Sequence, residues 1–150
     1  MRWISGLLTV VFLVFAGVAW GQECTVSGIP VSFGQYISND PSPVYGKGSV
    51  RVGCPVGTGF TVRLDPGENS GGNFHTRKLR SAMSGEVLNY NLYRDSAHAE
   101  VWGDGTSNTY VQVGMGAGVD VILNVYGRLL GNQNVGGGFY SDSISVTVEW

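Results

Sequence analysis

The residues that could support acid–base or metal chemistry are few and widely separated. His75 and His98 lie in different polar contexts, and neither has a nucleophile or carboxylate motif beside it. We therefore expect both histidines on the surface. Two cysteines and two distant histidines do not have the spacing of zinc ligands. The sequence predicts no catalytic residue, no metal site and no cofactor.

Four carboxylates could in principle supply a glycosidase pair: Asp95, Glu100, Asp104 and Asp142. Asp104 lies between two glycines and is better interpreted as a turn residue. Asp142 precedes an alternating segment, where it suits a hydrogen-bond acceptor at the start of a strand. A secreted hydrolase is therefore the weakest interpretation, because no nucleophile and base occur together. We predict that the protein is not an enzyme.

Two further motifs have structural explanations. The alternating glycines Gly114, Gly116 and Gly118 lack the six-residue pattern of a phosphate loop and any following helix, which indicates a bend or bulge. The basic cluster His75–Arg80, with Arg77, Lys78 and Arg80, is interpreted as a solvated strand end; an anion or partner contact is the alternative. The net charge of −2 makes neither nucleic acid nor an anionic membrane surface an expected partner.

The N-terminal segment has the features of a secretory signal peptide. Arg2 precedes the apolar run 7–18, and Ala19 and Gly21 provide small residues at a cleavage site before Gln22. The run is too short for a membrane span, although an uncleaved signal anchor is the alternative. We expect residues 1–21 to be removed, leaving one domain, 22–150, without a membrane span.

The two cysteines both follow the predicted signal peptide. In an oxidising compartment, Cys24 and Cys54 are expected to form one disulfide.

The composition favours short strands joined by tight turns, because only 13% of residues are charged and 24 are glycine. Alternating segments predict about seven strands, at 24–33, 48–54, 60–64, 86–93, 110–113, 119–125 and 143–150, with a further short strand at 77–83. Residues 99–102 lead into a tight turn at Gly103-Asp104-Gly105. Residues 34–46 are expected to form a loop, and Pro30 suggests an edge strand or a bulge. This pattern is typical of a β-sandwich.

Most aromatic residues in these segments are core residues by pattern. They are Tyr90, Tyr93, Trp102, Tyr126 and Tyr140. An exposed subset would be able to stack on sugars.

The last segment, Ser143–Trp150, alternates strictly and ends the sequence. Ile144, Val146, Val148 and Trp150 share one face. A strand needs a neighbour on each side, or it is left as an open edge. Our hypothesis is that the missing neighbour is supplied by another protein.

Several short motifs, taken in order, resemble one family. They are Cys24–Tyr36 with Phe33-Gly34-x-Tyr36; Val50–Cys54; Arg80; Leu88-x-Tyr90-x-Leu92-Tyr93 and Asp95; Trp102–Gly105; Val125–Arg128; and Gly138-x-Tyr140-x-Asp142. Over essentially the whole of 22–150 the sequence resembles the spore coat protein U domain family, secreted proteins related to archaic chaperone–usher pilins.

The resemblance implies an all-β, incomplete immunoglobulin-like (pilin-type) sandwich that is completed by a donated strand. It implies a periplasmic chaperone, an outer-membrane usher and other pilin or coat subunits as partners. Ile144, Val146, Val148 and Trp150 would lie along the groove that receives the strand. The protein would be secreted through the periplasm to a fimbria or coat at the cell surface.

The sequence departs from such pilins at its N-terminus, where they carry a long donor segment before the first cysteine. After the predicted cleavage only Gln22 and Glu23 precede Cys24. Two residues span at most about 7 Å, whereas successive pockets require about 6.6 Å per residue pair. We expect a subunit that accepts a strand but donates none, in a terminal or minor position or in a coat. The alternative is a carbohydrate-binding fimbrial tip adhesin.

Overall fold

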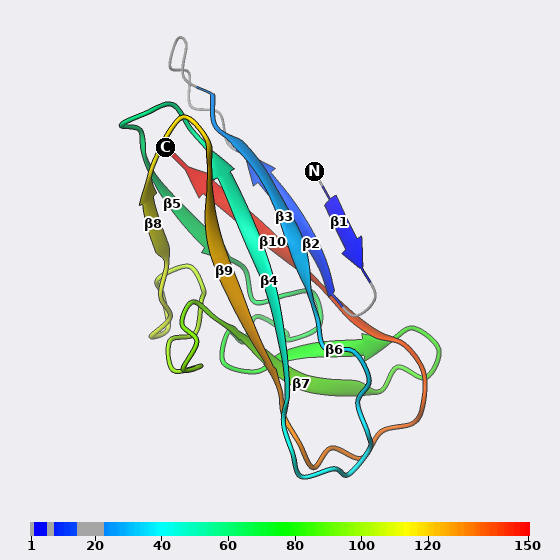
Figure 1. The fold of residues 1–150 in the computed structure, drawn as a ribbon. Helices are drawn as coiled ribbons and strands as arrows, with labels where there is room; N and C mark the ends of the chain where they lie inside the picture. Colours follow the sequence, from blue (N-terminus) through cyan, green and yellow to red (C-terminus); the bar gives the residue numbers. More distant parts are fainter. Residues whose placement is uncertain (1, 6–7, 15–22) are drawn as a thin grey trace.

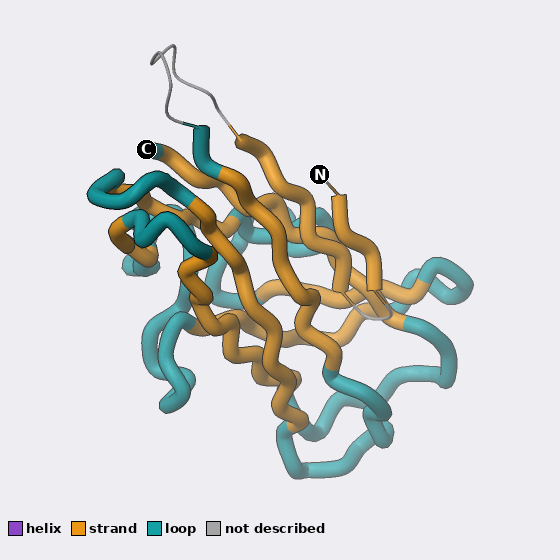
Figure 2. The backbone as a smooth tube through the Cα atoms, turned by 45° about the horizontal axis from the view of Figure 1, so that its top comes forward, coloured by secondary structure: helices purple, strands orange, loops and turns teal. Residues whose placement is uncertain are grey.

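The computed structural model describes residues 2–5, 8–14 and 23–150. These residues form ten strands and no helix (Figures 1 and 2). The described residues therefore contain no helix that could cross a membrane. The strands are β1 (Arg2–Ser5), β2 (Leu8–Val14), β3 (Thr25–Ser32), β4 (Val44–Gly53), β5 (Gly59–Leu64), β6 (Arg77–Ser81), β7 (Val87–Tyr93), β8 (Gln112–Met115), β9 (Asp120–Leu129) and β10 (Tyr140–Glu149).

The strands form two layers that share β10. Sheet A has the order β1-β2-β10-β5-β8, and sheet B has the order β10-β6-β7-β9-β4-β3. Tyr140 and Ser141 pair with β6 in sheet B, and the rest of β10 continues into sheet A. Among the described strand pairs, only β2 and β10 run parallel. The molecule is an all-β sandwich, as the alternating sequence predicts.

The core lies between the sheets because alternate side chains of each strand point inward. Val52, Val62, Leu79, Leu129 and Val148 are completely buried. Trp102 is also completely buried, and its indole N–H donates to the carbonyl of Val62 at 3.1 Å. This hydrogen bond satisfies the polar end of the ring, so the large side chain can lie in the interior at low cost.

The predicted disulfide is present between Cys24 and Cys54. It links the residue before β3 to the residue after β4, with a Cα–Cα distance of 4.4 Å. The two strands are therefore joined covalently at one end of their antiparallel pairing.

Several predicted boundaries are wrong, and glycines explain two of them. Strand β4 begins at Val44, inside the predicted loop, because Gly46 and Gly48 lie where a Cβ atom would collide with the backbone of β3. Strand β8 covers Gln112–Met115 instead of 110–113. Gly114, which we expected to break the strand, belongs to β8 because a side chain there would collide with the ring of Phe60.

Strand β3 is an edge strand with a bulge, as Pro30 suggests. Ile29 is opposite Ser49, but Ser32 is opposite Lys47, so the register shifts between them. Among the described strands, β3 pairs only with β4.

Candidate functional site

The two edges of β10 have different kinds of neighbour. On one side, Val146 and Val148 are opposite Leu64 and Val62 of β5, and the first residues of β10 pair with β6. On the other side, β10 pairs with β2 over seven residues, from Asp142 opposite Leu8 to Val148 opposite Val14. Strand β2 also lies alongside β3 (Figure 1). We call the facing edges of β3 and β10, with the position between them, the acceptor seam.

The strand in the acceptor seam comes from the segment that we predict to be a signal peptide. Within residues 23–150, no other described strand pairs with this edge of β10. In the full chain the neighbour required by the last strand is thus Leu8–Val14, whereas our hypothesis assigns it to another protein. Removal of residues 1–21 would take β2 away from both edges.

The side chains that we predicted for the groove lie together in the sandwich. Ile144 and Val146 are 1% exposed and Val148 is fully buried, while Trp150 is half-buried against the core. A small apolar cavity of about 20 Å³ is lined by residues of both seam edges, Val31 of β3 and Ile144 and Val146 of β10. Side chains from both edges of the acceptor seam therefore line the same part of the apolar interior.

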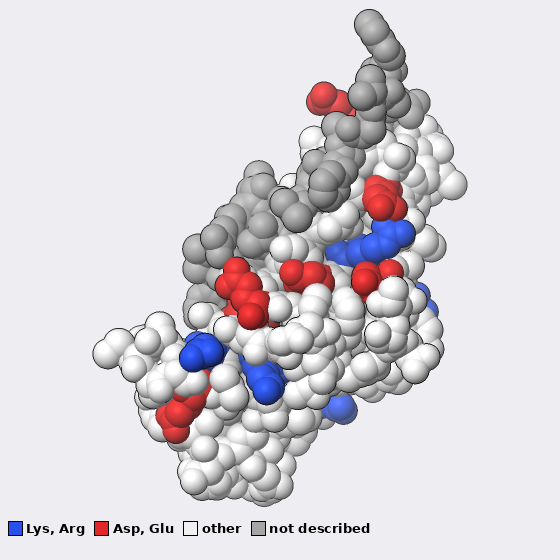
Figure 3. All heavy atoms as spheres, turned by 180° about the vertical axis from the view of Figure 1, so that it is seen from behind, with Lys and Arg blue, Asp and Glu red and all other residues white. Residues whose placement is uncertain are grey.

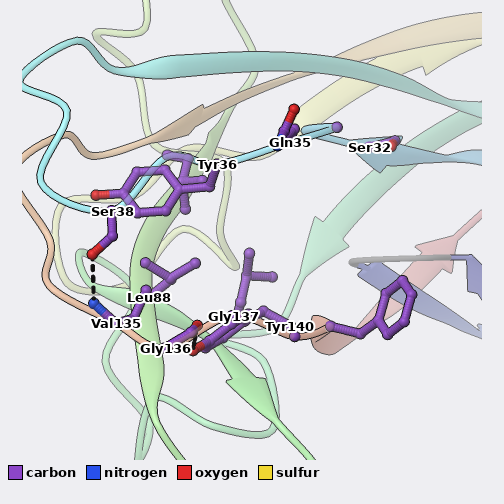
Figure 4. Close-up of a pocket in the computed structure, with 14 residues that line it drawn as sticks. Ser32, Gln35, Tyr36, Ser38, Leu88, Val135, Gly136, Gly137 and Tyr140 are labelled. Atoms are coloured by element: carbon purple, nitrogen blue, oxygen red, sulfur yellow. Dashed lines mark hydrogen bonds between the residues drawn. The ribbon is translucent and has the colours of Figure 1, made fainter.

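A larger pocket of about 580 Å³ lies at the end of the acceptor seam, where β3 ends at Ser32 and β10 begins at Tyr140. We call it the end pocket. In Figure 4, Tyr36 lies on one side of it, Gly136 and Gly137 on the other, and Leu88 between them. Among the described residues, the pairing of β2 with β10 begins with Leu8 opposite Asp142 and does not include Tyr140.

Hydrogen bonds between two loops fix the shape of the end pocket. The hydroxyl of Tyr36 donates to the carbonyl of Gln133 at 3.0 Å and accepts from its N–H at 2.8 Å. The N–H of Val135 donates to the Ser38 hydroxyl at 3.1 Å (Figure 4). The loop after β3 and the loop before β10 are thereby held on opposite sides of the pocket.

Beside the first residues of β10 lies a buried carboxylate. Asp142 accepts hydrogen bonds from the Tyr90 hydroxyl at 2.5 Å, the Glu68 N–H at 3.0 Å and the Asn69 amide at 3.0 Å. Burial raises the pKa of Asp142 to about 6, although the hydrogen bonds from Tyr90 and Glu68 and the charge of Arg77 act in the opposite direction. Burial also raises the pKa of Tyr90 well above its ordinary value, and the nearby Asp142 adds to this.

The structure corrects the interpretation of Arg77 as part of a solvated strand end. Arg77 is completely buried and donates to the carbonyls of Asp65 at 2.7 Å and Trp102 at 2.8 Å, and to the Asn91 side chain at 2.7 Å. Burial lowers the pKa of its guanidinium, an effect opposed by Tyr90, Asp65 and Asp142. Arg77 and Leu79 are two residues apart and therefore lie on the same, inward face of β6. This alternation is the feature of the sequence that indicates burial of Arg77.

The other candidate carboxylates hold turns or pair with a cation. Asp95 accepts from the N–H groups of Ala99 and Glu100, and Glu100 pairs with Arg94 at 2.6 Å. Asp104 accepts from the N–H and hydroxyl of Thr106, as expected of a turn residue. Among the described residues, no group of three or more His, Cys, Asp or Glu is placed to hold a metal ion.

The two histidines have different surroundings. His75 is exposed, with its Nε2 2.6 Å from the carbonyl of Ser107. His98 is half-buried among tyrosine rings on the outer face of sheet B. Tyr126 also lies on this outer face and is half-buried, whereas Tyr90, Tyr93, Trp102 and Tyr140 are buried as predicted.

The fold is similar to that of solved structures from pili. The sandwich is similar to the chaperone–tip adhesion subunit pre-assembly complex of the archaic chaperone–usher Csu pili of Acinetobacter baumannii, with a TM-score of 0.60 and 21% identity. The match covers 86% of this chain, which spans 40% of that chain. The minor tip subunit of the E. coli Hda pilus matches with a TM-score of 0.43 and 19% identity, over 82% of this chain and 80% of that one.

The sequence comparisons agree with the pilin-like fold. Protein U of Myxococcus xanthus is 31% identical over 144 residues, which is 85% of this chain and 78% of that protein. The model of the Spore Coat Protein U domain matches residues 9–147. The chain therefore belongs to the Spore Coat Protein U domain family.

Proposed function

We propose that the protein is a secreted structural subunit that accepts one donated β-strand in its acceptor seam and so joins a fimbria or coat. The single observation that carries this proposal is the position of β2, which pairs with seven residues of β10 and lies alongside β3. A segment outside 22–150 already occupies the place where a donated strand would lie.

The energetics of an empty seam favour a partner. Loss of β2 would leave unpaired backbone groups along β10 and uncover part of the interior around Ile144, Val146 and Val148. Full burial of such side chains stabilises a fold by roughly 1.5–3 kcal/mol each, as an upper bound. Strand addition restores both the backbone hydrogen bonds and the apolar cover, and alternate side chains set the register.

The end pocket favours an occupant longer than β2. A strand that extended the β2 pairing by two residues would reach Tyr140 and bring a side chain to the pocket. Apolar lining residues such as Leu79, Leu88 and Leu129 suit an apolar side chain there.

The order of partners is part of the proposal. A periplasmic chaperone would fill the seam first, and a neighbouring subunit would replace it at an outer-membrane usher. Similarity to a chain of a chaperone–tip adhesion subunit pre-assembly complex supports a chaperone as the first partner. If cleavage follows Gly21, only two residues precede Cys24, which favours a terminal or minor position. Sequencing of the exported protein's N-terminus tests that position, because a longer segment before Cys24 would contradict it.

The acceptor seam is tested by adding a strand to residues 22–150. In Figure 1 the C-terminal end of β10 lies at the end of the molecule opposite β6 and β7. A short Gly-rich turn after Trp150 would let an appended strand run back beside β10. We expect an appended strand with alternating apolar residues to give a soluble monomer with a much higher thermal midpoint than residues 22–150 alone.

The control carries the same turn and strand with the apolar residues replaced by Ser. We expect this control to remain as unstable or aggregated as residues 22–150. A stable monomer of residues 22–150, unchanged by either extension, would contradict the proposal.

A second candidate function is glycan binding. The observation that favours it is the exposed ring of Tyr45 and the half-buried ring of Tyr126 on the outer face of sheet B.

A further inference from the structure

The outer face of sheet B carries a compact group of aromatic and basic side chains. Tyr45 and Lys47 of β4 are opposite Arg128 and Tyr126 of β9, and His98 lies over them from the loop after β7. We call these five residues the aromatic–basic patch. Tyr45 is 57% exposed and Lys47 is exposed, so the patch is open to solvent.

The loop that carries His98 is held in an uncommon conformation. His98 has a φ of 55°, in the left-handed region that residues other than glycine rarely adopt. The loop is fixed by hydrogen bonds from the N–H groups of Ala99 and Glu100 to Asp95. As a result, the imidazole centroid lies 4.9 Å from that of Tyr45 and 6.2 Å from that of Tyr126.

The cations of the patch are supported by rings. The Lys47 ammonium lies 5.4 Å from the centroid of Tyr126. The Arg128 guanidinium lies 5.2 Å from the centroid of Tyr93 and donates to its hydroxyl at 2.9 Å. Cation–π contacts orient both side chains without neutralising their charge.

The face around the patch contains little negative charge. Arg51 follows on the same side of β4, and the outward residues of β9 from Ile122 to Arg128 include no acid. Two acidic residues lie near His98 in the sequence: Asp95 accepts from the N–H groups of Ala99 and Glu100, and Glu100 pairs with Arg94. By contrast, Figure 3 shows basic and acidic side chains intermixed on the opposite side of the molecule. The patch is thus locally cationic in a chain of net charge −2.

We propose that the aromatic–basic patch binds an acidic polysaccharide, a polymer whose sugar rings carry carboxylates. An exposed tyrosine ring stacks on the apolar face of a sugar, while ammonium and guanidinium groups bind carboxylates. This inference deepens the second candidate function, glycan binding, and does not depend on the acceptor seam.

The charge balance of the chain favours this ligand class over nucleic acid. Domains that bind nucleic acid are usually basic overall, whereas this chain has a net charge of −2. The patch combines two permanent cations, Lys47 and Arg128, on adjacent strands with an exposed tyrosine ring. A few cations beside an aromatic ring suit a carboxylate-bearing sugar polymer, whereas a polyphosphate chain is bound mainly through many cations.

The test uses the exported protein in the assembled form in which it is recovered, with polygalacturonate as the probe. Affinity electrophoresis in gels containing the polymer gives the dissociation constant. We expect the double variant Lys47→Gln/Arg128→Gln to bind at least about tenfold more weakly, because two charge-assisted contacts are lost. Tyr45→Ala should weaken binding by about two- to tenfold.

The matched control is Arg63→Gln, which removes one cation from β5 in sheet A and should leave binding unchanged. Circular dichroism melting establishes that each variant folds, and Arg128→Lys should retain binding. Unchanged binding by the folded double variant would overturn the proposal. Equal binding of carboxyl-reduced polymer, or tighter binding of a single-stranded oligonucleotide, would also overturn it. None of these results would bear on the appended-strand experiment.

Discussion

The two ends of β10 differ in how their requirements are met. At its beginning, Asp142 is buried and its carboxylate is satisfied by Tyr90, Glu68 and Asn69, all within the described residues 23–150. Further along, Ile144, Val146 and Val148 are buried in an apolar interior, and one backbone edge is paired only through β2 among the described strands. One strand thus has a polar half that the domain completes and an apolar half that relies on a segment outside it.

One strand can therefore have polar groups that are satisfied within its own domain and, a few residues away, a backbone edge that needs a strand from outside the domain. Side-chain hydrogen bonds from Tyr90 and Asn69 close the polar half because donors and acceptor lie on different elements that are already in place. A strand edge has no such substitute, because its repeated backbone groups require another strand. Variants in each half should therefore respond differently to an added strand.

The largest effect is expected for Val146→Asp, which places a charge in the apolar half. Val146 is 1% exposed, and an unpaired buried carboxylate should cost at least about 5 kcal/mol, comparable with the total stability of a domain. Export should be lost, as measured by immunoblotting of the extracellular fraction. Thr147→Asp, on the partly exposed face of β10, is the control and should be exported normally. Normal export of both variants would show that the two faces of β10 are equivalent.

The next effect, about 3–5 kcal/mol, is expected for Arg77→Met in β6, the strand that pairs with the first residues of β10. The change leaves the carbonyls of Asp65 and Trp102 without a buried donor. Denaturant unfolding should report this loss equally with and without the appended strand, because Arg77 does not lie on the seam. Lys78→Met, the neighbouring half-exposed position, should change stability by less than about 0.5 kcal/mol. A loss at Arg77 that disappears when the strand is appended would contradict the distinction.

The smallest effect is a pH dependence from Asp142. Its pKa is about 6 in the folded chain and about 3.9 in an unfolded one, so the folded state binds the proton more tightly. The stabilisation is complete below the unfolded value and is lost as the pH rises through 6. Lowering the pH from 7 to 5 should therefore raise the free energy of unfolding by about 1 kcal/mol.

Denaturant unfolding of the strand-appended chain at several pH values measures this dependence. Asp142→Asn should remove it, because the amide does not titrate. Tyr90→Phe should move the window to higher pH, because it removes a donor that favours the carboxylate. A free energy of unfolding that falls between pH 7 and pH 5 in the wild type, but not in Asp142→Asn, would contradict the raised pKa.

Much of the fold could be predicted from alternation alone. The strands at β5, β7 and β10, the disulfide and the edge position of β3 follow from period-two patterning, compartment and Pro30. The inward row Ile144, Val146 and Val148 was also predictable, because parity in a strand decides which side chains are buried.

The remainder depends on contacts between distant elements. Arg77 looked like part of a solvated basic cluster because its acceptors, Asp65, Asn91 and Trp102, are far away in sequence. The start of β4 at Val44 depends on the close approach of β3 to Gly46 and Gly48. The pairing of Leu8–Val14 with β10 is not predictable from the sequence either, because the features of residues 1–21 indicate a leader that is removed.

The bulge in β3 makes the two edges of the acceptor seam unequal in their ability to pair with an incoming strand. Pro30 has no amide hydrogen, and the register shift between Ile29 and Ser32 interrupts the regular spacing that an incoming backbone would need. Strand β2 accordingly hydrogen-bonds to β10 and only lies against β3. If two copies of this molecule met through their β3 edges, they could not form a continuous ladder of backbone hydrogen bonds. Edge-to-edge aggregation of identical domains is therefore disfavoured, whereas insertion of one strand beside β10 is not.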